Sequence, residues 1–219
     1  SYCIVPFARG VPRSRPLTRI LATMETLAEK GIQEVVLTGI EISAWRDAQT
    51  GHGLKELIGL LEDAPTPRRI RLSSVDPLMF DDAFIETVAS SRKIAKSFHI
   101  PLQSGSDALL AAMGRPYRQR DIGRITERIL EHIPDAGIGM DVIVGFPGED
   151  EELFGQTHAF LDSCGVYYLH VFPFSPRPGT RAVLMDGKVP ETTKKDRVRS
   201  LKSLDAQQRE AFHRRFVGR

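Results

Sequence analysis

Short apolar segments alternate with longer segments of helical periodicity along the 219-residue chain. In the segment 17–30, for example, Ile20, Leu21, Met24 and Leu27 recur three or four positions apart, which favours a helix with one buried face. The predicted strands are 35–37, 70–72, 98–100, 142–144 and 168–172, and the predicted helices are 17–30, 54–62, 81–90, 106–114, 120–132, 150–162 and 192–216. Strands and helices that alternate in this way predict one α/β domain with a parallel sheet, as a barrel or as a doubly wound sheet.

Small and polar residues follow directly after every predicted strand. These endings are TGIE at 38–41, SSVD at 73–76, QSG at 103–105, GFPGE at 145–149 and FSPR at 174–177. In α/β barrels, ligands bind at the carboxyl ends of the strands. One such ending would indicate only a turn, but a whole series of them predicts a ligand-binding edge.

The composition narrows the class of protein. With 41% hydrophobic and 26% charged residues, the chain is typical of a globular protein and not of a disordered or fibrous one. It contains no apolar run long enough to span a membrane. The two cysteines, Cys3 and Cys164, do not make a disulfide framework, which favours a reducing cytoplasm, and we expect Cys164 to serve packing at a helix end. Because the sequence begins with a serine, we expect it to belong to a longer gene product.

The net charge of +2 is unevenly distributed. Residues 1–24 carry four arginines and no acid, and residues 194–219 carry nine Lys or Arg against three acids. Basic ends on an acidic body suggest a polyanionic partner that binds at particular surfaces. For the C-terminal run, the alternative is a charged helix face that only contacts solvent.

The histidines and the tryptophan have simpler interpretations. The six histidines show no spacing typical of metal ligands, so we predict no zinc site. His99 and His170 lie within predicted strands and are expected to be hydrogen-bonded barrel residues. Trp45 lies on a predicted loop beside Arg46, where stacking on a nucleic-acid base is one use and partial burial is the expected one.

Cys3 lies in an unusual local sequence. A single cysteine is ordinarily a small buried hydrophobic residue. Here arginines follow at positions 9, 13 and 15, and an electropositive loop favours the anionic thiolate. From the residues alone, Cys3 is therefore a candidate for either role.

The segment 1–16 resembles the end of the motif C-x-x-x-C-x-x-C of radical S-adenosylmethionine (SAM) enzymes, as it occurs in methylthiotransferases. In that family an aromatic-Pro-Arg-Gly stretch and then Arg-Ser-Arg-Pro follow the third cysteine, and here VPFARG and RSRP follow Cys3. The segments 37–40, 99–106 and 141–149 are similar to the family's second, fourth and fifth strand elements. The likeness covers nearly the whole chain and, on residues 37–40, 71–74 and 170–180, is greatest to the threonylcarbamoyladenosine tRNA methylthiotransferases.

The resemblance implies a fold and a division of the chain. The fold would be a partial radical SAM (β/α)6 barrel, whose parallel sheet is open on one side and whose first strand and part of the cluster-binding loop lie outside this sequence. Residues 1–219 would form the core domain. Within it, 1–16 would end the cluster-binding loop, and the helix 192–216 would lead toward an RNA-binding domain.

The resemblance also implies cofactors and site residues. Cys3 would be one of three thiolates that hold a [4Fe–4S] cluster, whose open iron binds SAM. A second [4Fe–4S] cluster would lie in an upstream domain. The residues that contact SAM would be Thr38, Gly39, Ser73, Gln103, Asp141, Gly145 and Phe172. Candidates for substrate or phosphate contacts would be Arg13, Arg15, Arg177 and Arg181.

The activity implied by the resemblance is the addition of a methylthio group to a modified adenosine next to the tRNA anticodon, preferably threonylcarbamoyladenosine. Isopentenyladenosine tRNA and a ribosomal protein are alternative substrates. The expected partners are tRNA and an electron donor of the flavodoxin or ferredoxin type, for a cytoplasmic monomer that does not bind membranes. No catalytic side chain is assigned beyond the cofactors, and with one cysteine of the motif the 219 residues are expected to be inactive alone.

Two other classes of protein are alternatives. An aldolase-type lyase would need a buried Schiff-base lysine on a strand, and the predicted strands contain no lysine. An RNA-binding barrel that lost its chemistry fits the basic C-terminal run. It does not explain why so many strand endings resemble SAM-binding elements.

Overall fold

The protein, described by a computed structural model over residues 1–218, divides into two compact units. The β1–β2 unit comprises residues 11–99 and 128–136, and the β4–β5 unit comprises residues 1–10, 100–127 and 137 onward. Strand β3 (Ser97–Gln103) and helix α6 (Gln119–His132) have residues in both units. That residues 1–219 act as a single domain stays a prediction.

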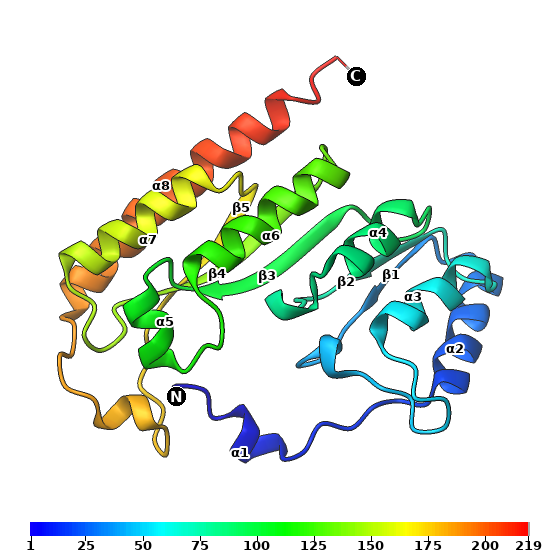
Figure 1. Cartoon of the computed structure of the whole chain (residues 1–219), viewed down its shortest axis with the longest axis horizontal. Helices are drawn as coiled ribbons and strands as arrows, with labels where there is room; N and C mark the ends of the chain where they lie inside the picture. The colour runs from blue at the N-terminus through cyan, green and yellow to red at the C-terminus, as the bar shows by residue number, and fades with distance from the viewer. Residues whose placement is uncertain (219) are drawn as a thin grey trace. The chain divides into compact units, whose positions relative to one another are not determined.

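The β1–β2 unit is built on two parallel strands. These are β1 (Glu34–Leu37) and β2 (Arg69–Leu72), whose register runs from Glu34 opposite Arg69 to Leu37 opposite Leu72. Its helices are α2 (Leu17–Glu29), α3 (Leu54–Asp63) and α4 (Asp82–Ser90), with single turns of 3-10 helix, η1 and η2, at Ile42–Ala44 and Pro77–Met79 (Figure 1). Helix α3 buries Leu54, Leu57, Ile58 and Leu61, the spacing expected of a helix with one apolar face.

The β4–β5 unit is built on the strand order β3-β4-β5, with β4 (Gly137–Val144) and β5 (Tyr168–Pro173) paired in parallel. Besides α6, it contains α1 (Val5–Arg9), α5 (Asp107–Met113), α7 (Glu151–Ser163), the 3-10 turn η3 (Arg181–Leu184) and α8 (Glu191–Arg214). Helix α8 lies along β5 and also contacts α7 (Figure 1). Strand β4 is buried at nearly every position, which explains its continuous apolar sequence.

The predicted strands and helices are confirmed, with ends that differ by a few residues. The strands form one two-stranded and one three-stranded parallel sheet, so the described residues form no closed barrel, in agreement with the predicted partial barrel. Helix α1 lies inside the segment that was predicted as loop. It was missed because five residues are too few to show helical periodicity, although Pro6 suits a first helical turn. Among the described residues, no helix is long and apolar enough to cross a membrane.

Candidate functional site

Three of the predicted SAM-contacting residues, Thr38, Gly39 and Ser73, follow directly after β1 and β2. The N–H of Ser73 donates to the carbonyl oxygen of Leu37 at 2.9 Å, so the two strand endings lie at one edge of the sheet. The Oγ atom of Ser73 is buried and has no hydrogen-bond partner among the described residues. Because a buried hydroxyl without a partner costs free energy, this atom is a candidate for a ligand contact.

Apolar side chains are exposed at the same edge. Val36 within β1 is 54% exposed, and Ile40 just beyond it is 63% exposed. Single exposed apolar side chains are common, so these two mark only an apolar surface that a ligand could cover. The β1–β2 unit thus has an orphaned hydroxyl and exposed apolar side chains near the ends of its strands, which would suit a ligand that is partly polar and partly apolar, as SAM is.

The arginine-rich segment 13–16 is attached to η1. The indole Nε1 of Trp45 donates to the carbonyl oxygen of Arg15 at 2.8 Å, and the N–H of Arg46 donates to Ser14 Oγ at 3.0 Å. Trp45 is half-buried, as predicted, and its indole N–H is used by this hydrogen bond. Arg13 and Arg15 themselves are exposed, so they are available for the predicted phosphate contacts.

Gln103, at the end of β3, has an unusual backbone conformation. Its φ is +76°, and it is the one non-glycine residue with positive φ within residues 1–218. Holding such a residue in this region costs about 1–3 kcal/mol, and the cost is common at ligand sites. Gln103 is also buried, at 7% exposure. Sequence reasoning selected Gln103 from the family likeness but had no signal for the strain.

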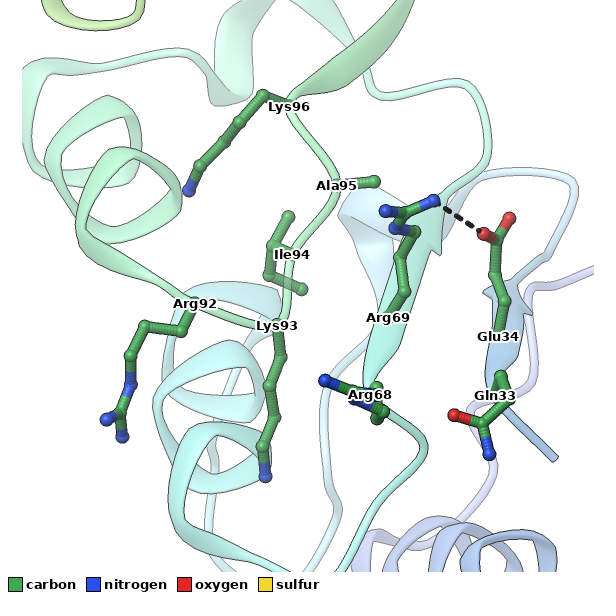
Figure 2. Close-up of a pocket in the computed structure, with 9 residues that line it drawn as sticks. All are labelled: Gln33, Glu34, Arg68, Arg69, Arg92, Lys93, Ile94, Ala95 and Lys96. Atoms are coloured by element: carbon green, nitrogen blue, oxygen red, sulfur yellow. Dashed lines mark hydrogen bonds and ion pairs between the residues drawn. The ribbon is translucent and has the colours of Figure 1, made fainter. Parts of the chain in front are cut away.

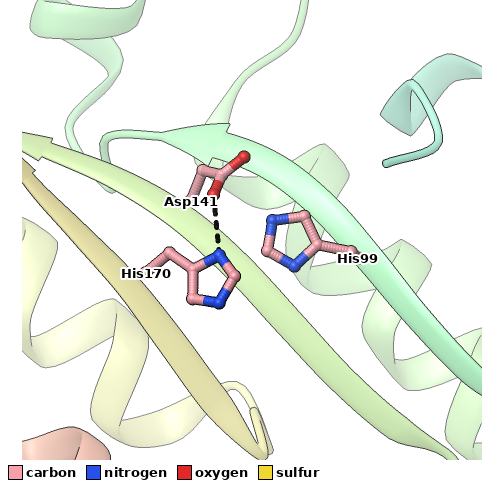
Figure 3. Close-up of side chains that lie close together, drawn as sticks. All are labelled: His99, Asp141 and His170. Carbon is pink, nitrogen blue, oxygen red and sulfur yellow. Dashed lines mark ion pairs between the residues drawn. The ribbon is translucent and has the colours of Figure 1, made fainter. Parts of the chain in front are cut away.

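Asp141 of β4 and His170 of β5 are opposite each other in the strand register, with 3.4 Å between Asp141 Oδ1 and His170 Nδ1 (Figure 3). Tyr168, His170 and Phe172 alternate along β5 with their rings in edge or tilted contact. Phe172 is 50% exposed. The structure therefore brings the predicted residues Asp141 and Phe172 to one strand face and adds His170 to them. A search for metal-ligand spacing could not find this pair, because it depends on the register of two strands.

The turn after β4 begins at Gly145, whose φ is +73°. A Cβ atom there would lie 2.3 Å from Cγ of Lys194, so only glycine fits. The Gly145 N–H donates to Glu149 Oε1 at 2.8 Å. Burial raises the pKa of Glu149, while the Gly145 N–H and the Arg197 guanidinium act in the opposite direction.

Cys3 is exposed, and the residues around it hold its segment to the β4–β5 unit. Ser1 N donates to the Met113 carbonyl oxygen at 2.9 Å, and Ala182 N–H donates to the Ser1 carbonyl oxygen at 3.0 Å. The ring of Tyr2 contacts the edge of Phe146, in the turn that starts at Gly145, with 6.1 Å between centroids. The structure thus brings the predicted cluster ligand close to the turn after β4.

Arg177 and Arg181, the remaining predicted residues, are exposed in the segment after β5. The carbonyl oxygen of Arg177 accepts hydrogen bonds from the N–H and the hydroxyl of Thr180, at 3.1 Å and 2.8 Å, which fixes the turn between them. Arg181 begins η3, next to Ala182. Both guanidinium groups therefore belong to the same unit as Cys3.

A basic pocket of about 650 Å³ lies at the amino ends of β1 and β2, opposite to the predicted ligand-binding edge (Figure 2). Lys93 Nζ donates to the carbonyl oxygens of Leu61 and Ala64 at the end of α3, and Lys96 Nζ donates to those of Ala89 and Ser91 at the end of α4. Cations at helix C-termini stabilise the helix dipole. These lysines therefore serve the fold and are not part of the predicted site.

The residues of this chain suit the two expected cofactors, SAM and a [4Fe–4S] cluster, to different degrees. Each unit by itself carries groups that would suit a part of SAM: the β1–β2 unit has the orphaned hydroxyl of Ser73 and the exposed Val36 and Ile40, and the β4–β5 unit has the buried, strained Gln103. For a three-thiolate cluster they are insufficient, since the sequence has two cysteines and Cys164 is unsuitable. Burial at the end of α7 raises the pKa of Cys164 to about 12, as fits its predicted packing role, so its thiol stays protonated. Cys3 alone cannot hold such a cluster.

The sequence model of the Radical SAM superfamily matches residues 1–161. The chain therefore belongs to the Radical SAM superfamily, whose cofactors are the predicted [4Fe–4S] cluster and SAM. This confirms the family and the fold class that were expected from the strand endings.

Two curated relatives are similar over the whole chain. The threonylcarbamoyladenosine tRNA methylthiotransferase MtaB of Aquifex aeolicus (strain VF5) is 40% identical over 219 residues, which are 100% of this chain and 53% of that protein. The protein of the same name from Rickettsia prowazekii (strain Madrid E) is 35% identical over 220 residues, which are 100% of this chain and 52% of that protein. The chain thus spans about half the length of these relatives.

The fold is similar to that of TsrM, a radical SAM methyltransferase from Kitasatospora setae whose structure has cobalamin and a [4Fe–4S] cluster bound. The TM-score is 0.59 at 20% identity, over 73% of this chain and 31% of that chain. At this identity the similarity concerns the fold alone. The roles of the individual site residues stay predictions.

Proposed function

We propose that the chain is the radical SAM part of a tRNA methylthiotransferase that modifies threonylcarbamoyladenosine beside the anticodon. The observation that carries the proposal is the similarity to two MtaB proteins along the whole chain, at 40% and 35% identity. The isopentenyladenosine enzymes and the ribosomal-protein enzymes are the alternatives that the experiment below distinguishes.

The part of this chain in the reaction is to bind and orient SAM and to keep water away from it. In the longer protein, a bound [4Fe–4S] cluster and SAM would supply the radical chemistry at the adenine base, and the residues of this chain would hold SAM in place for it. Ser73 Oγ and the Gln103 side chain offer hydrogen bonds to SAM, and the Asp141 carboxylate accepts one from a hydroxyl group. Phe172 and the neighbouring rings on β5 cover the apolar side and exclude water.

The remaining components lie outside these residues in our proposal. Cys3 provides one cluster thiolate, and two further thiolates, the second cluster and an RNA-binding domain belong to other parts of a longer protein. The partners are tRNA and a flavodoxin-type or ferredoxin-type electron donor, and the protein acts as a cytoplasmic monomer. The 219 residues alone are inactive.

The test uses the full-length protein, reconstituted anaerobically with iron and sulfide, and tRNA from a strain that lacks the gene. We expect SAM cleavage to 5′-deoxyadenosine and formation of the methylthio derivative of threonylcarbamoyladenosine, measured by mass spectrometry of nucleosides. Cys3→Ala should abolish both products, whereas Cys164→Ala should retain them. Methylthio-isopentenyladenosine or a modified ribosomal protein would support an alternative substrate, and a reconstituted protein that forms no 5′-deoxyadenosine would refute the radical assignment.

A further inference from the structure

Two cations of helix α8 are buried against the turn that follows β4. Lys194 and Arg197 are each 5% exposed and lie one helical turn apart. Lysine and arginine are almost never fully buried unless they are paired. Their burial corrects the interpretation of the C-terminal basic run as a solvent-exposed face or a polyanion-binding surface at these two positions.

Arg197 holds both ends of the turn 145–149. Its Nη1 donates to Glu149 Oε1 at 2.7 Å and to the Glu149 carbonyl oxygen at 3.0 Å. The same Oε1 atom accepts the Gly145 N–H at 2.8 Å. One guanidinium group therefore fixes the last residue of the turn directly and its first residue through the carboxylate.

Lys194 holds the turn from another direction. Its methylene groups cover Gly145 so closely that no Cβ atom fits there. Its Nζ donates to the Phe174 carbonyl oxygen at 3.2 Å and to Glu191 Oε1 at 2.7 Å. Since Phe174 N–H donates to the Val144 carbonyl oxygen at 2.8 Å, Lys194 connects α8 to the ends of β4 and β5 together.

Stability alone does not require this arrangement. A buried ion pair loses hydration, and replacing both partners with apolar residues is often neutral or stabilising, whereas removing one partner is strongly destabilising. The side chains of Arg197 and Glu149 are 6% and 2% exposed, so both have lost their hydration. What an apolar pair would not reproduce is the directed set of hydrogen bonds to the backbone of the turn.

We propose that Lys194 and Arg197 are positioning residues that fix the turn 145–149 in the conformation that receives SAM. The inference rests on the proposed function, in which Gly145 is a SAM contact. The two residues act through the backbone of the turn and do not touch the cofactor. Helix α8 thus supports the proposed SAM site from outside, although none of its residues was predicted to have a role there.

The experiment compares Arg197→Met with Arg199→Met in the reconstituted full-length protein. Arg199 lies on the same helix with its side chain 79% exposed, so it is a matched control. The measurements are the SAM dissociation constant by equilibrium dialysis and amide hydrogen exchange of residues 145–149 by mass spectrometry. For Arg197→Met we expect about tenfold weaker SAM binding and at least about tenfold faster exchange, in line with the loss of charge-assisted hydrogen bonds. Arg199→Met should change neither.

The double variant Glu149→Gln/Arg197→Met separates positioning from stability, and it remains usable if Arg197→Met fails to fold. It leaves no unpaired charge, so its melting temperature should return toward that of the wild type, while SAM binding stays weakened. Full recovery of SAM affinity together with stability would overturn the inference, as would equal effects of Arg197→Met and Arg199→Met. If the wild-type protein binds no SAM, the proposed function fails, and the amide exchange still decides whether Arg197 fixes the turn.

Discussion

The two units end their strands in different ways. After β1 and β2, a backbone hydrogen bond joins the two endings, but Ser73 Oγ has no partner within the described residues and Val36 and Ile40 are exposed. After β4, the carboxylate of Glu149 accepts hydrogen bonds from the Gly145 N–H and from the buried Arg197 of α8, and Phe146 is fully buried. One ending leaves contacts to be made by a ligand, and the other is complete before a ligand arrives. A preorganised ending loses little freedom on binding, while an open one gains contacts.

The largest difference between the two strand endings is expected in the loss of stability when alanine replaces Gly145 or Gly39. Gly145→Ala should destabilise the protein by about 2–4 kcal/mol, because it combines a positive φ with overlap against Lys194. Gly39→Ala should cost less, about 1 kcal/mol, since the φ of Gly39 is not positive and the nearest contact of a Cβ atom there would be Ile42 Cγ2 at 3.1 Å. Urea unfolding of the full-length protein without cofactors measures both values. Equal destabilisation would show that the two endings are packed alike.

A smaller effect is expected from Ser73→Ala. Removing a buried hydroxyl that has no protein partner should leave the melting temperature unchanged or slightly higher, whereas SAM binding should weaken about three- to tenfold if the hydroxyl contacts SAM. Ser104→Ala is the control, since Ser104 Oγ is hydrogen-bonded to Thr157 Oγ1 at 3.1 Å. That variant should lose about 1 kcal/mol of stability. A lower melting temperature for Ser73→Ala would mean that its hydroxyl has a structural role.

The smallest effect is expected for the pH dependence of stability that Asp47 gives to the β1–β2 unit. The Leu17 N–H, with further hydrogen bonds from Thr50 and Gln49, lowers the pKa of Asp47 from 3.8 to about 2. Because this pKa is lower in the folded protein, the stability that Asp47 contributes is present above about pH 4 and is lost as the pH falls toward 2. The difference in urea midpoint between the wild type and Asp47→Asn, without cofactors, should therefore shrink over this range. A constant difference would contradict the assigned pKa.

The elements of the fold were predictable because their patterns are local. Helix α3 and strand β4 show their period and their apolar run within a few residues. The ligand-binding edge could be predicted from local sequence too, because small and polar residues follow each predicted strand. Helix α1 was missed because it is short, and its residues show no period.

The rest of the site depends on contacts between distant residues. Glu149 and Arg197 are 48 positions apart, and no local pattern indicates that this arginine is buried while Arg199 is exposed. The pair of Asp141 and His170 exists only because β4 and β5 pair in one particular register. The strain at Gln103 likewise follows from how β3 ends, and a glutamine in a sequence does not reveal it.

The contact between Tyr2 and Phe146 has a practical consequence for protein engineering. Phe146 belongs to a small buried cluster with Leu109, Met113 and Ala182, and Tyr2 packs against that cluster from outside. Trimming the first residues would therefore uncover apolar surface and invite aggregation.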